Sequence, residues 1–243
     1  MQPLDLVEVF SSIQGEGKYV GYRQVFVRLA GCNATCAYCD TEQSRRAGAQ
    51  GRIESVAGGR DFVAVANPVP AEELARRINS LLTAPHHSVS FTGGEPLCQA
   101  EALSGLLPLV KGRIYLETNG TLPAALALVL PQVAIISMDI KLPSTAGREY
   151  WQEHAEFLRL AATREIFVKI VVTGQTEKKE FRRAMEIVAA VDAAIPVVIQ
   201  PVSPVNFVRG IAPEAVLKLQ AEALAVLSDV RVIPQTHKFM GQL

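Results

Sequence analysis

The stretch Gln24-Val-Phe-Val-Arg-Leu-Ala-Gly-Cys32-Asn-Ala-Thr-Cys36-Ala-Tyr-Cys39-Asp-Thr41 joins an apolar run to three closely spaced cysteines. The run over residues 24–29 is rich in β-branched and aromatic side chains, which predicts a buried strand. The cysteines follow this strand directly, in the spacing C-x3-C-x2-C. Thiolates at this spacing can converge on one metal centre from a single tight loop, so we expect metal or redox chemistry where the strand ends.

Three interpretations of the cysteine loop are open at this point. Three thiolates on a four-iron cluster would leave one iron free for a non-protein ligand, which suits iron–sulfur ligation. A zinc site normally takes four protein ligands and would need a histidine as well. A redox C-x-x-C pair would leave Cys32 unexplained. The fourth cysteine, Cys98, is more readily explained as a small buried hydrophobic residue than as a ligand. The histidines all lie far from the loop in sequence, at His86, His87, His154 and His237.

Further apolar runs alternate with segments of helical periodicity. We expect the remaining strands at 88–91, 113–117, 133–139, 166–172, 196–200 and 229–233, and helices at 71–83, 98–109, 122–130, 148–162, 177–191 and 212–227. Such alternation predicts an α/β fold with a parallel sheet, either open or wrapped into a partial or complete barrel. The length of 243 residues suits one domain over 1–243. Residues 42–68 are polar and glycine-rich and interrupt the pattern, as a long functional or disordered loop would.

Polar residues stand at the predicted carboxyl ends of the strands, where parallel α/β folds bind their ligands. They are Thr92-Gly-Gly-Glu95, Glu117-Thr-Asn-Gly120, Asp139-Ile-Lys141, Thr173-Gly174 and Gln235-Thr-His-Lys238. Any one of them could be ordinary loop chemistry. Five together predict a binding face.

The composition excludes several classes of protein. With 49% hydrophobic residues the chain can form a core, which excludes general disorder. The 24 basic residues balance the 24 acidic ones, so we expect no direct nucleic-acid partner and no anionic membrane surface. No apolar run approaches the ~20 residues of a membrane span. Asp5 and Glu8 stand in a segment without the basic start of a secretory signal, so we expect a reduced, cytoplasmic protein.

The cysteine loop together with Thr92-Gly-Gly-Glu-Pro96 resembles the radical S-adenosylmethionine (SAM) enzymes. Within them, Glu8-Val-Phe-Ser-Ser-Ile-Gln-Gly-Glu-Gly17 and the segment at 235–238 are similar to the 7-carboxy-7-deazaguanine synthase family. The matching segments run from about Glu8 to Lys238. The resemblance implies an incomplete barrel of about six parallel strands that works as a homodimer. The weakest match is the segment 42–68.

This resemblance also implies a reaction. The substrate would be 6-carboxy-5,6,7,8-tetrahydropterin, which loses a hydrogen at C6, contracts its ring and releases ammonia to give 7-carboxy-7-deazaguanine for queuosine and other 7-deazapurines. The implied cofactors are a 4Fe–4S cluster, SAM, which is regenerated at the end of the cycle, and Mg2+. An electron donor such as flavodoxin or ferredoxin would reduce the cluster.

Roles carry over to residues that match the family's motifs. Cys32, Cys36 and Cys39 would ligate the cluster, and Thr41 would contact Mg2+, a hard cation that prefers oxygen ligands. The substrate contacts implied are Ile13, Gln14, Gly15, Glu16, Arg28, Thr92 and His237. The SAM contacts implied are Tyr38, Cys39, Asp40, Gly94, Glu95, Ser137, Asp139 and Lys141.

Several of these residues also suit a plainer role. A buried arginine such as Arg28 is rare unless paired, and its partner could be the substrate carboxylate or a carboxylate of the core. Thr41 could be a helix N-cap, and His237 could be structural. Ser137, Asp139 and Lys141 project to one side of a strand, which could be an exposed face. The rival functions are a glycyl-radical activase, which acts on a protein, and a zinc module or iron–sulfur scaffold without activity.

Overall fold

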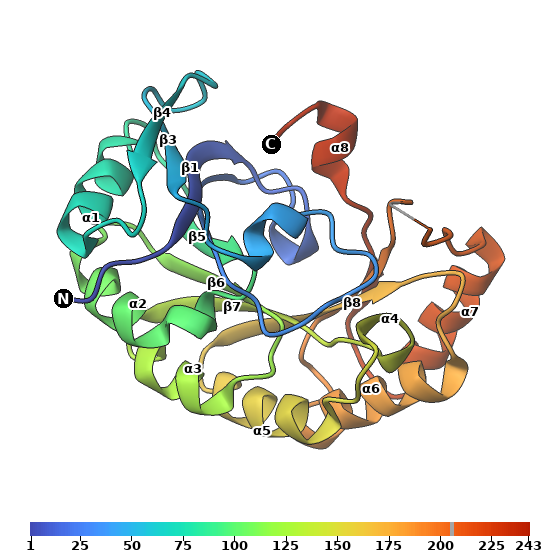
Figure 1. Cartoon of the computed structure of the whole chain (residues 1–243). Helices are drawn as coiled ribbons and strands as arrows, with labels where there is room; N and C mark the ends of the chain where they lie inside the picture. The colour runs from blue at the N-terminus through green and yellow to red at the C-terminus, as the bar shows by residue number, and fades with distance from the viewer. Residues whose placement is uncertain (205–206) are drawn as a thin grey trace.

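The computed structural model describes residues 1–204 and 207–243, and its described strands form one ten-stranded sheet (Figure 1). The strand order is β10-β9-β8-β7-β6-β5-β2-β1-β3-β4. The strands are β1 (Leu6–Ile13), β2 (Arg23–Leu29), β3 (Gln50–Glu54), β4 (Phe62–Ala66), β5 (Ser88–Gly93), β6 (Ile114–Thr118), β7 (Val133–Asp139), β8 (Glu165–Val172), β9 (Val197–Pro201) and β10 (Val230–Val232). The order is open, with β4 and β10 at its ends, and the sheet curves into a partial barrel.

The predicted parallel sheet is confirmed. Strands β2, β5, β6, β7, β8, β9 and β10 pair in parallel, and they correspond to the seven strands expected from the sequence. The partial barrel therefore has one parallel strand more than the six that the resemblance implied. Because these strands run in one direction, their carboxyl ends meet at one edge of the sheet.

Helices alternate with the parallel strands and cover the outer face of the curved sheet (Figure 1). They are α1 (Ala71–Ser80), α2 (Ala100–Leu106), α3 (Pro123–Val129), α5 (Trp151–Ala161), α6 (Lys178–Val191) and α7 (Pro213–Leu224), close to the expected ranges. Proline at the first position starts α3 and α7, where its missing N–H costs nothing. Two short helices, α4 (Pro143–Ala146) and α8 (Thr236–Met240), lie beyond strand ends and were not expected.

Side chains alternate between the two faces of each strand, and this alternation places the site. Outward residues such as Leu116, Ile136 and Val168 pack against the helices in the main core. Inward residues near the strand starts, including Tyr115 and Phe167, form a second apolar cluster inside the barrel. Farther along the same strands the inward residues become polar: Glu117, Ser137, Asp139, Lys169 and Gln200. The interior is therefore filled at one end and polar at the other.

Two segments differ from expectation. Residues 42–68 do not form an irregular loop: they contain a 3-10 turn (Glu42–Arg45) and the antiparallel hairpin β3–β4. The hairpin is hard to detect in the sequence because the side chains of β4 do not alternate between buried and exposed positions, and most of them are exposed. The guanidinium of Arg52 on β3 stacks on the ring of Phe62 on β4, at 4.4 Å. Strand β1 was also missed; it pairs antiparallel with β2 and parallel with β3, so it joins the hairpin to the barrel. Among the described helices none is long and apolar enough to cross a bilayer.

Candidate active site

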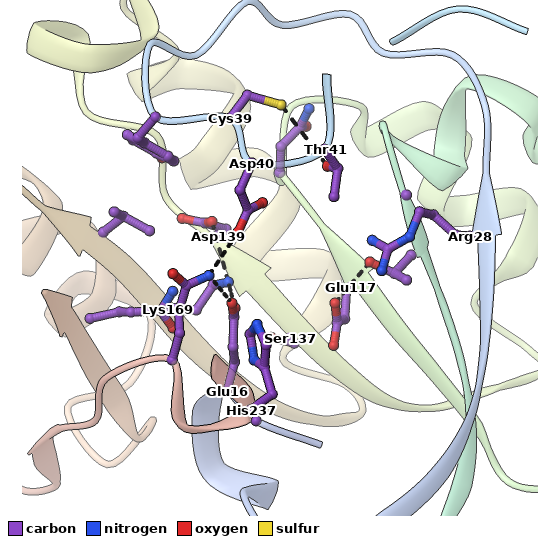
Figure 2. Close-up of a pocket in the computed structure, with 18 of the residues that line it drawn as sticks. Glu16, Arg28, Cys39, Asp40, Thr41, Glu117, Ser137, Asp139, Lys169 and His237 are labelled. Carbon is purple, nitrogen blue, oxygen red and sulfur yellow. Dashed lines mark hydrogen bonds and ion pairs between the residues drawn. The ribbon is translucent and has the colours of Figure 1, made fainter. Parts of the chain in front are cut away.

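A cavity of about 580 Å³ opens at the carboxyl ends of the parallel strands (Figure 2). Its volume lies in the range of sites for small molecules. Every residue that the sequence predicted for the cluster, Mg2+, SAM or the substrate lines this cavity. They come from β1 and the turn after it, from β2, β5 and β7, from the cysteine loop and from α8.

The cysteine loop presents three free thiols, Cys32, Cys36 and Cys39, to this cavity. In the described parts of the chain, no three His, Cys, Asp or Glu side chains converge closely enough to share one metal ion. A three-cysteine zinc site would need such convergence, whereas in a four-iron cluster each thiolate binds a different iron. Cys98 does not line the cavity, and its side chain is exposed, so its interpretation as a buried hydrophobic residue was wrong.

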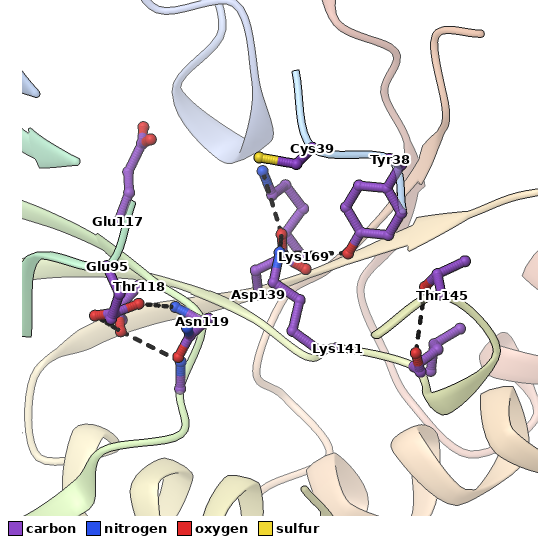
Figure 3. Close-up of polar contacts among 12 residues, drawn as sticks. Tyr38, Cys39, Glu95, Glu117, Thr118, Asn119, Asp139, Lys141, Thr145 and Lys169 are labelled. Atoms are coloured by element: carbon purple, nitrogen blue, oxygen red, sulfur yellow. Dashed lines mark hydrogen bonds and ion pairs between the residues drawn. The ribbon is translucent and has the colours of Figure 1, made fainter. Parts of the chain in front are cut away.

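The Thr92-Gly-Gly-Glu segment fixes the start of the cysteine loop. A side chain at Gly94 would place its Cβ 2.1 Å from the carbonyl oxygen of Gly31, so only glycine allows this approach. The Glu95 amide then donates to the same oxygen at 2.7 Å. Burial raises the pKa of the Glu95 carboxyl, and the Asn119 amide (2.7 Å) and Thr118 hydroxyl (2.8 Å) donate to it (Figure 3). The carboxyl is thereby held rigidly beside the loop.

The two motifs near the chain ends meet at one wall of the cavity. A Cβ at Gly15 would lie 2.3 Å from Nδ1 of His237, so this glycine lets the histidine pack directly on the backbone of the turn. The Thr236 amide donates to the Gly15 carbonyl at 2.8 Å. The side chain of Gln14 supports the turn, since it accepts from the Glu16 amide at 3.0 Å. The Gln-Gly-Glu-Gly turn and the Gln-Thr-His-Lys segment therefore form one structure.

Alternating charges cross the cavity floor (Figures 2 and 3). Lys169 forms an ion pair with Glu16, and its Nζ lies 3.7 Å from Oδ2 of Asp139. Lys141 Nζ lies 2.8 Å from the same oxygen and 3.3 Å from the hydroxyl of Tyr38, in the cysteine loop. The chain of charges therefore connects the turn after β1 with the cysteine loop.

Glu16, Lys169 and Lys141 stay ionised although water is largely excluded from them, because each lies beside an opposite charge. Burial raises the pKa of the Glu16 carboxyl, but the charge of Lys169 and hydrogen bonds from Lys169 and Gln235 outweigh it and lower the pKa to about 2. Burial lowers the pKa of Lys169, but Glu16 and Asp139 raise it above its ordinary value. The pKa of Lys141 is raised by Asp139 in the same way. The cavity therefore offers fixed charges to a polar ligand.

Arg28 reaches the cavity from β2 and is also paired within the protein. Its Nε donates to Oε1 of Glu8 at 2.9 Å, and Glu8 also accepts from Nε of Arg52 at 2.8 Å. A core carboxylate is thus confirmed as a partner, yet Arg28 still lines the cavity, and Figure 2 shows its guanidinium directed inward. Glu8 takes Nε, and the described residues make no hydrogen bond with the two terminal nitrogens, which can therefore bind a ligand.

The hydrogen bonds of Thr41 and Thr173 differ from what an N-cap and a cavity residue would make. Thr41 stands at the N-cap position of the turn Glu42–Arg45, but its hydroxyl makes no capping bond and lies 4.0 Å from Sγ of Cys39. Thr173 and Gly174 do not line the cavity; the Thr173 hydroxyl accepts from the Gln175 amide at 3.0 Å. The assignment of Thr173 and Gly174 to the binding face was wrong because this strand end turns into the loop before α6.

Lys169 and Gln200 line the cavity but were not singled out from the sequence, and Glu117 was placed only on the predicted binding face. Glu117 accepts from the Gln14 amide and the Thr92 hydroxyl, each at 2.8 Å. Lys169 stands out in the sequence as the lone cation in the apolar strand Ile166–Val172, and that signal could have found it. Oδ1 of Asp139 is buried and has no hydrogen-bond partner among the described residues. An unpaired buried acceptor suits a ligand with hydroxyl donors, as the ribose of SAM has.

Comparison with known proteins decides the family. Residues 27–188 match the Radical SAM superfamily. A 7-carboxy-7-deazaguanine synthase of Geobacter sulfurreducens is 48% identical over 98% of this chain and 98% of its own, and one of Archaeoglobus fulgidus is 37% identical over the same shares. The chain belongs to the 7-carboxy-7-deazaguanine synthase family of radical SAM enzymes. Its membership confirms the resemblance drawn from the cysteine loop and the Thr-Gly-Gly-Glu segment.

Solved structures support the same fold. The crystal structure of QueE from Escherichia coli superposes with a TM-score of 0.63 at 20% identity, over 97% of this chain and 95% of that one. A radical SAM methyltransferase from Sphaerobacter thermophilus gives a TM-score of 0.60 at 13% identity, over 88% and 70%. Radical SAM enzymes use a 4Fe–4S cluster and SAM, and the three free thiols and the unpaired Asp139 oxygen fit these groups.

Proposed function

We propose that this protein converts 6-carboxy-5,6,7,8-tetrahydropterin to 7-carboxy-7-deazaguanine with release of ammonia, a step toward queuosine and other 7-deazapurines. The observation that carries the proposal is one cavity lined both by the three free thiols and by the half-buried opposite charges of Glu16 and Arg28. A glycyl-radical activase acts on a protein, and it would have no use for this pair of small-molecule contacts.

The two charges suit the two ends of the substrate. The forked guanidinium of Arg28 matches a carboxylate, which can accept two parallel N–H bonds. Glu16 is ionised and can accept from the amino and ring N–H groups of the pterin. Thr92 and His237 line the same cavity and add polar contacts for the substrate. The substrate is thereby oriented by charges that are already in place, which lowers the cost of ordering it.

On the other side of the cavity, Cys32, Cys36 and Cys39 would hold the cluster, and Ser137, Asp139 and Lys141 would contact SAM together with Gly94, Glu95, Tyr38 and Asp40. When bound, the cluster and SAM would supply a 5′-deoxyadenosyl radical for hydrogen abstraction. The protein's own part is to keep that chemistry away from water and at a fixed distance from the pterin. The hydroxyl of Thr41 has no capping bond and would contact Mg2+ beside the substrate carboxylate.

The partners and location belong to the same proposal. The protein would act as a homodimer, take electrons from a flavodoxin or ferredoxin, and work in the cytoplasm. All four cysteines are free, as is usual in reducing compartments.

The proposal is tested by turnover. Protein reconstituted with iron and sulfide under anaerobic conditions is mixed with SAM, a reductant, Mg2+ and the tetrahydropterin, and the products are separated by chromatography and mass spectrometry. We expect 7-carboxy-7-deazaguanine and ammonia in equal amounts. Cleavage of SAM with no ring-contracted product would contradict the assignment of the substrate.

A further inference from the structure

Lys169 lies on β8 between the two sides of the cavity, at a position where packing alone does not require a cation. Its inward neighbours along the strand, Phe167 and Val171, are apolar. The side chain of Lys169 is 14% exposed and forms an ion pair with Glu16, 153 positions away in the sequence. A buried ammonium is costly unless it is paired, so its presence in an apolar strand points to a role at the site.

Within the described residues, Lys169 supplies the only ammonium that pairs with Glu16. The other groups that face this carboxylate are the Gln235 amide, which donates at 2.7 Å, the His237 imidazole and the phenol of Tyr115. Asp139 shares the ammonium of Lys169 with Glu16, at 3.7 Å from Nζ. Without Lys169, Glu16 would lose the one ammonium that pairs with it among the described residues, and the loss of this counter-charge favours its protonated form.

We propose that Lys169 is a positioning residue for the substrate: it keeps Glu16 ionised and aimed at the amino-bearing edge of the pterin. Asp139, at 3.7 Å, is the second anchor that holds the ammonium in place. This inference rests on the proposed function, because Glu16 is assigned there to the pterin. It goes further, since Lys169 is given no contact with the substrate and acts through Glu16.

The test compares pterin and SAM binding by anaerobic calorimetry in the cluster-loaded protein and in Lys169→Met, which keeps the length of the side chain and removes its charge. In the variant we expect pterin affinity at neutral pH to fall about 10- to 100-fold, because a protonated Glu16 no longer offers a charged acceptor to the pterin. Affinity should recover as the pH rises toward 9, while the parent stays flat. SAM affinity should change much less, because Lys141 still pairs with Asp139.

Three further variants make the result specific. Lys169→Arg, which keeps the charge, should recover most of the affinity and the flat pH profile. Glu16→Gln combined with Lys169→Met should lose the pH dependence that Lys169→Met shows, because the carboxylate that titrates has been removed. Lys218→Met, on the exposed face of α7, is the matched control and should bind as the parent does. If Lys169→Met fails to load the cluster, Lys169→Gln takes its place with the same expectations.

The outcomes separate this inference from the proposed function. A parent protein that binds SAM but not the pterin would overturn the proposed function and the inference with it. A parent that binds the pterin, with Lys169→Met binding it equally well at every pH, would overturn the inference alone. Equal losses for pterin and SAM that Lys169→Arg does not restore would also overturn it, because they indicate a general structural role.

Discussion

Arg28 and Glu8 form an ion pair between neighbouring strands, with Nε of the arginine 2.9 Å from Oε1 of the glutamate. Glu8 is held from its other side by Arg52, on the hairpin β3–β4. A segment that the sequence presented as an irregular excursion thus supports, through one carboxylate, a residue that faces the cavity. The pair fixes the orientation of Arg28 before any ligand arrives.

Removing Arg28 should therefore weaken pterin binding and leave SAM binding intact. Losing a charge-assisted bond to a buried partner costs roughly 2–5 kcal/mol, or about 30-fold to several-thousand-fold in affinity. Arg28→Lys should also bind poorly, because an ammonium cannot reproduce the forked geometry. Calorimetric titration with each ligand measures this. If Arg28→Ala binds the pterin like the parent, the ion pair with Glu8 is the whole role of Arg28.

Glu8→Gln tests the orienting role separately. The amide keeps the shape but not the charge, so Arg28 should remain in the cavity with less fixed geometry. We expect a loss of pterin affinity smaller than for Arg28→Ala, with the cluster retained, and the same calorimetric titration measures it. A loss as large as that of Arg28→Ala would show that the glutamate does more than orient the arginine.

The cysteine loop yields a prediction with an internal control. Replacing Cys32, Cys36 or Cys39 by Ala should abolish the broad visible absorbance of the cluster and all turnover, because a three-ligand site cannot lose one thiolate. Cys98→Ala is the control and should retain both, since Cys98 lies outside the cavity. Iron and sulfide analysis of each variant measures how much cluster it holds. A Cys36→Ala protein that still cleaves SAM reductively would contradict the ligand assignment.

Mg2+ is assigned to the substrate side of the cavity. In its absence we expect SAM cleavage to persist while product formation falls. Thr41→Ala should show the same separation at every Mg2+ concentration, whereas Thr41→Ser, which keeps the hydroxyl, should resemble the parent. A Mg2+ titration of product formation in the three proteins decides between them. Equal activity of Thr41→Ala and the parent would assign Thr41 to the loop alone.

His154 on α5 should make stability depend on pH. It is fully buried, and burial lowers its pKa from 6.5 to about 4, against the hydrogen bond from Nε2 to the Asn119 carbonyl. The unfolded chain therefore binds a proton that the folded one does not between these pH values. The free energy of unfolding is therefore highest above pH 6.5. It falls by about 1.4 kcal/mol per pH unit as the pH drops from 6.5 to about 4. Urea unfolding of His154→Gln should show a shallower loss than the parent; identical slopes would exclude this residue as the cause.

The sequence predicted the parallel strands and the edge of the sheet where the cavity lies, because both depend on local patterns. Apolar β-branched runs specify buried strands, and polar residues just after them fall at one edge of a parallel sheet. The sequence did not reveal elements whose formation depends on pairing with strands far away in the chain. Strand β1 and the hairpin exist because they pair with each other and with β2, and the exposed side chains of β4 give no alternation to detect. The partners of Arg28 and Lys169 were likewise invisible, because Glu8 and Glu16 meet them only in the folded barrel.

The central claim is that the cavity brings the C6 hydrogen of the tetrahydropterin to the radical formed from SAM. The most direct measurement is turnover with substrate that carries deuterium at C6, followed by mass spectrometry of the 7-carboxy-7-deazaguanine and of the recovered SAM. The account predicts ring-contracted product together with deuterium in the 5′-methylene group of the recovered SAM. Product that forms while the recovered SAM stays free of deuterium, or SAM consumed without any ring contraction, would contradict it.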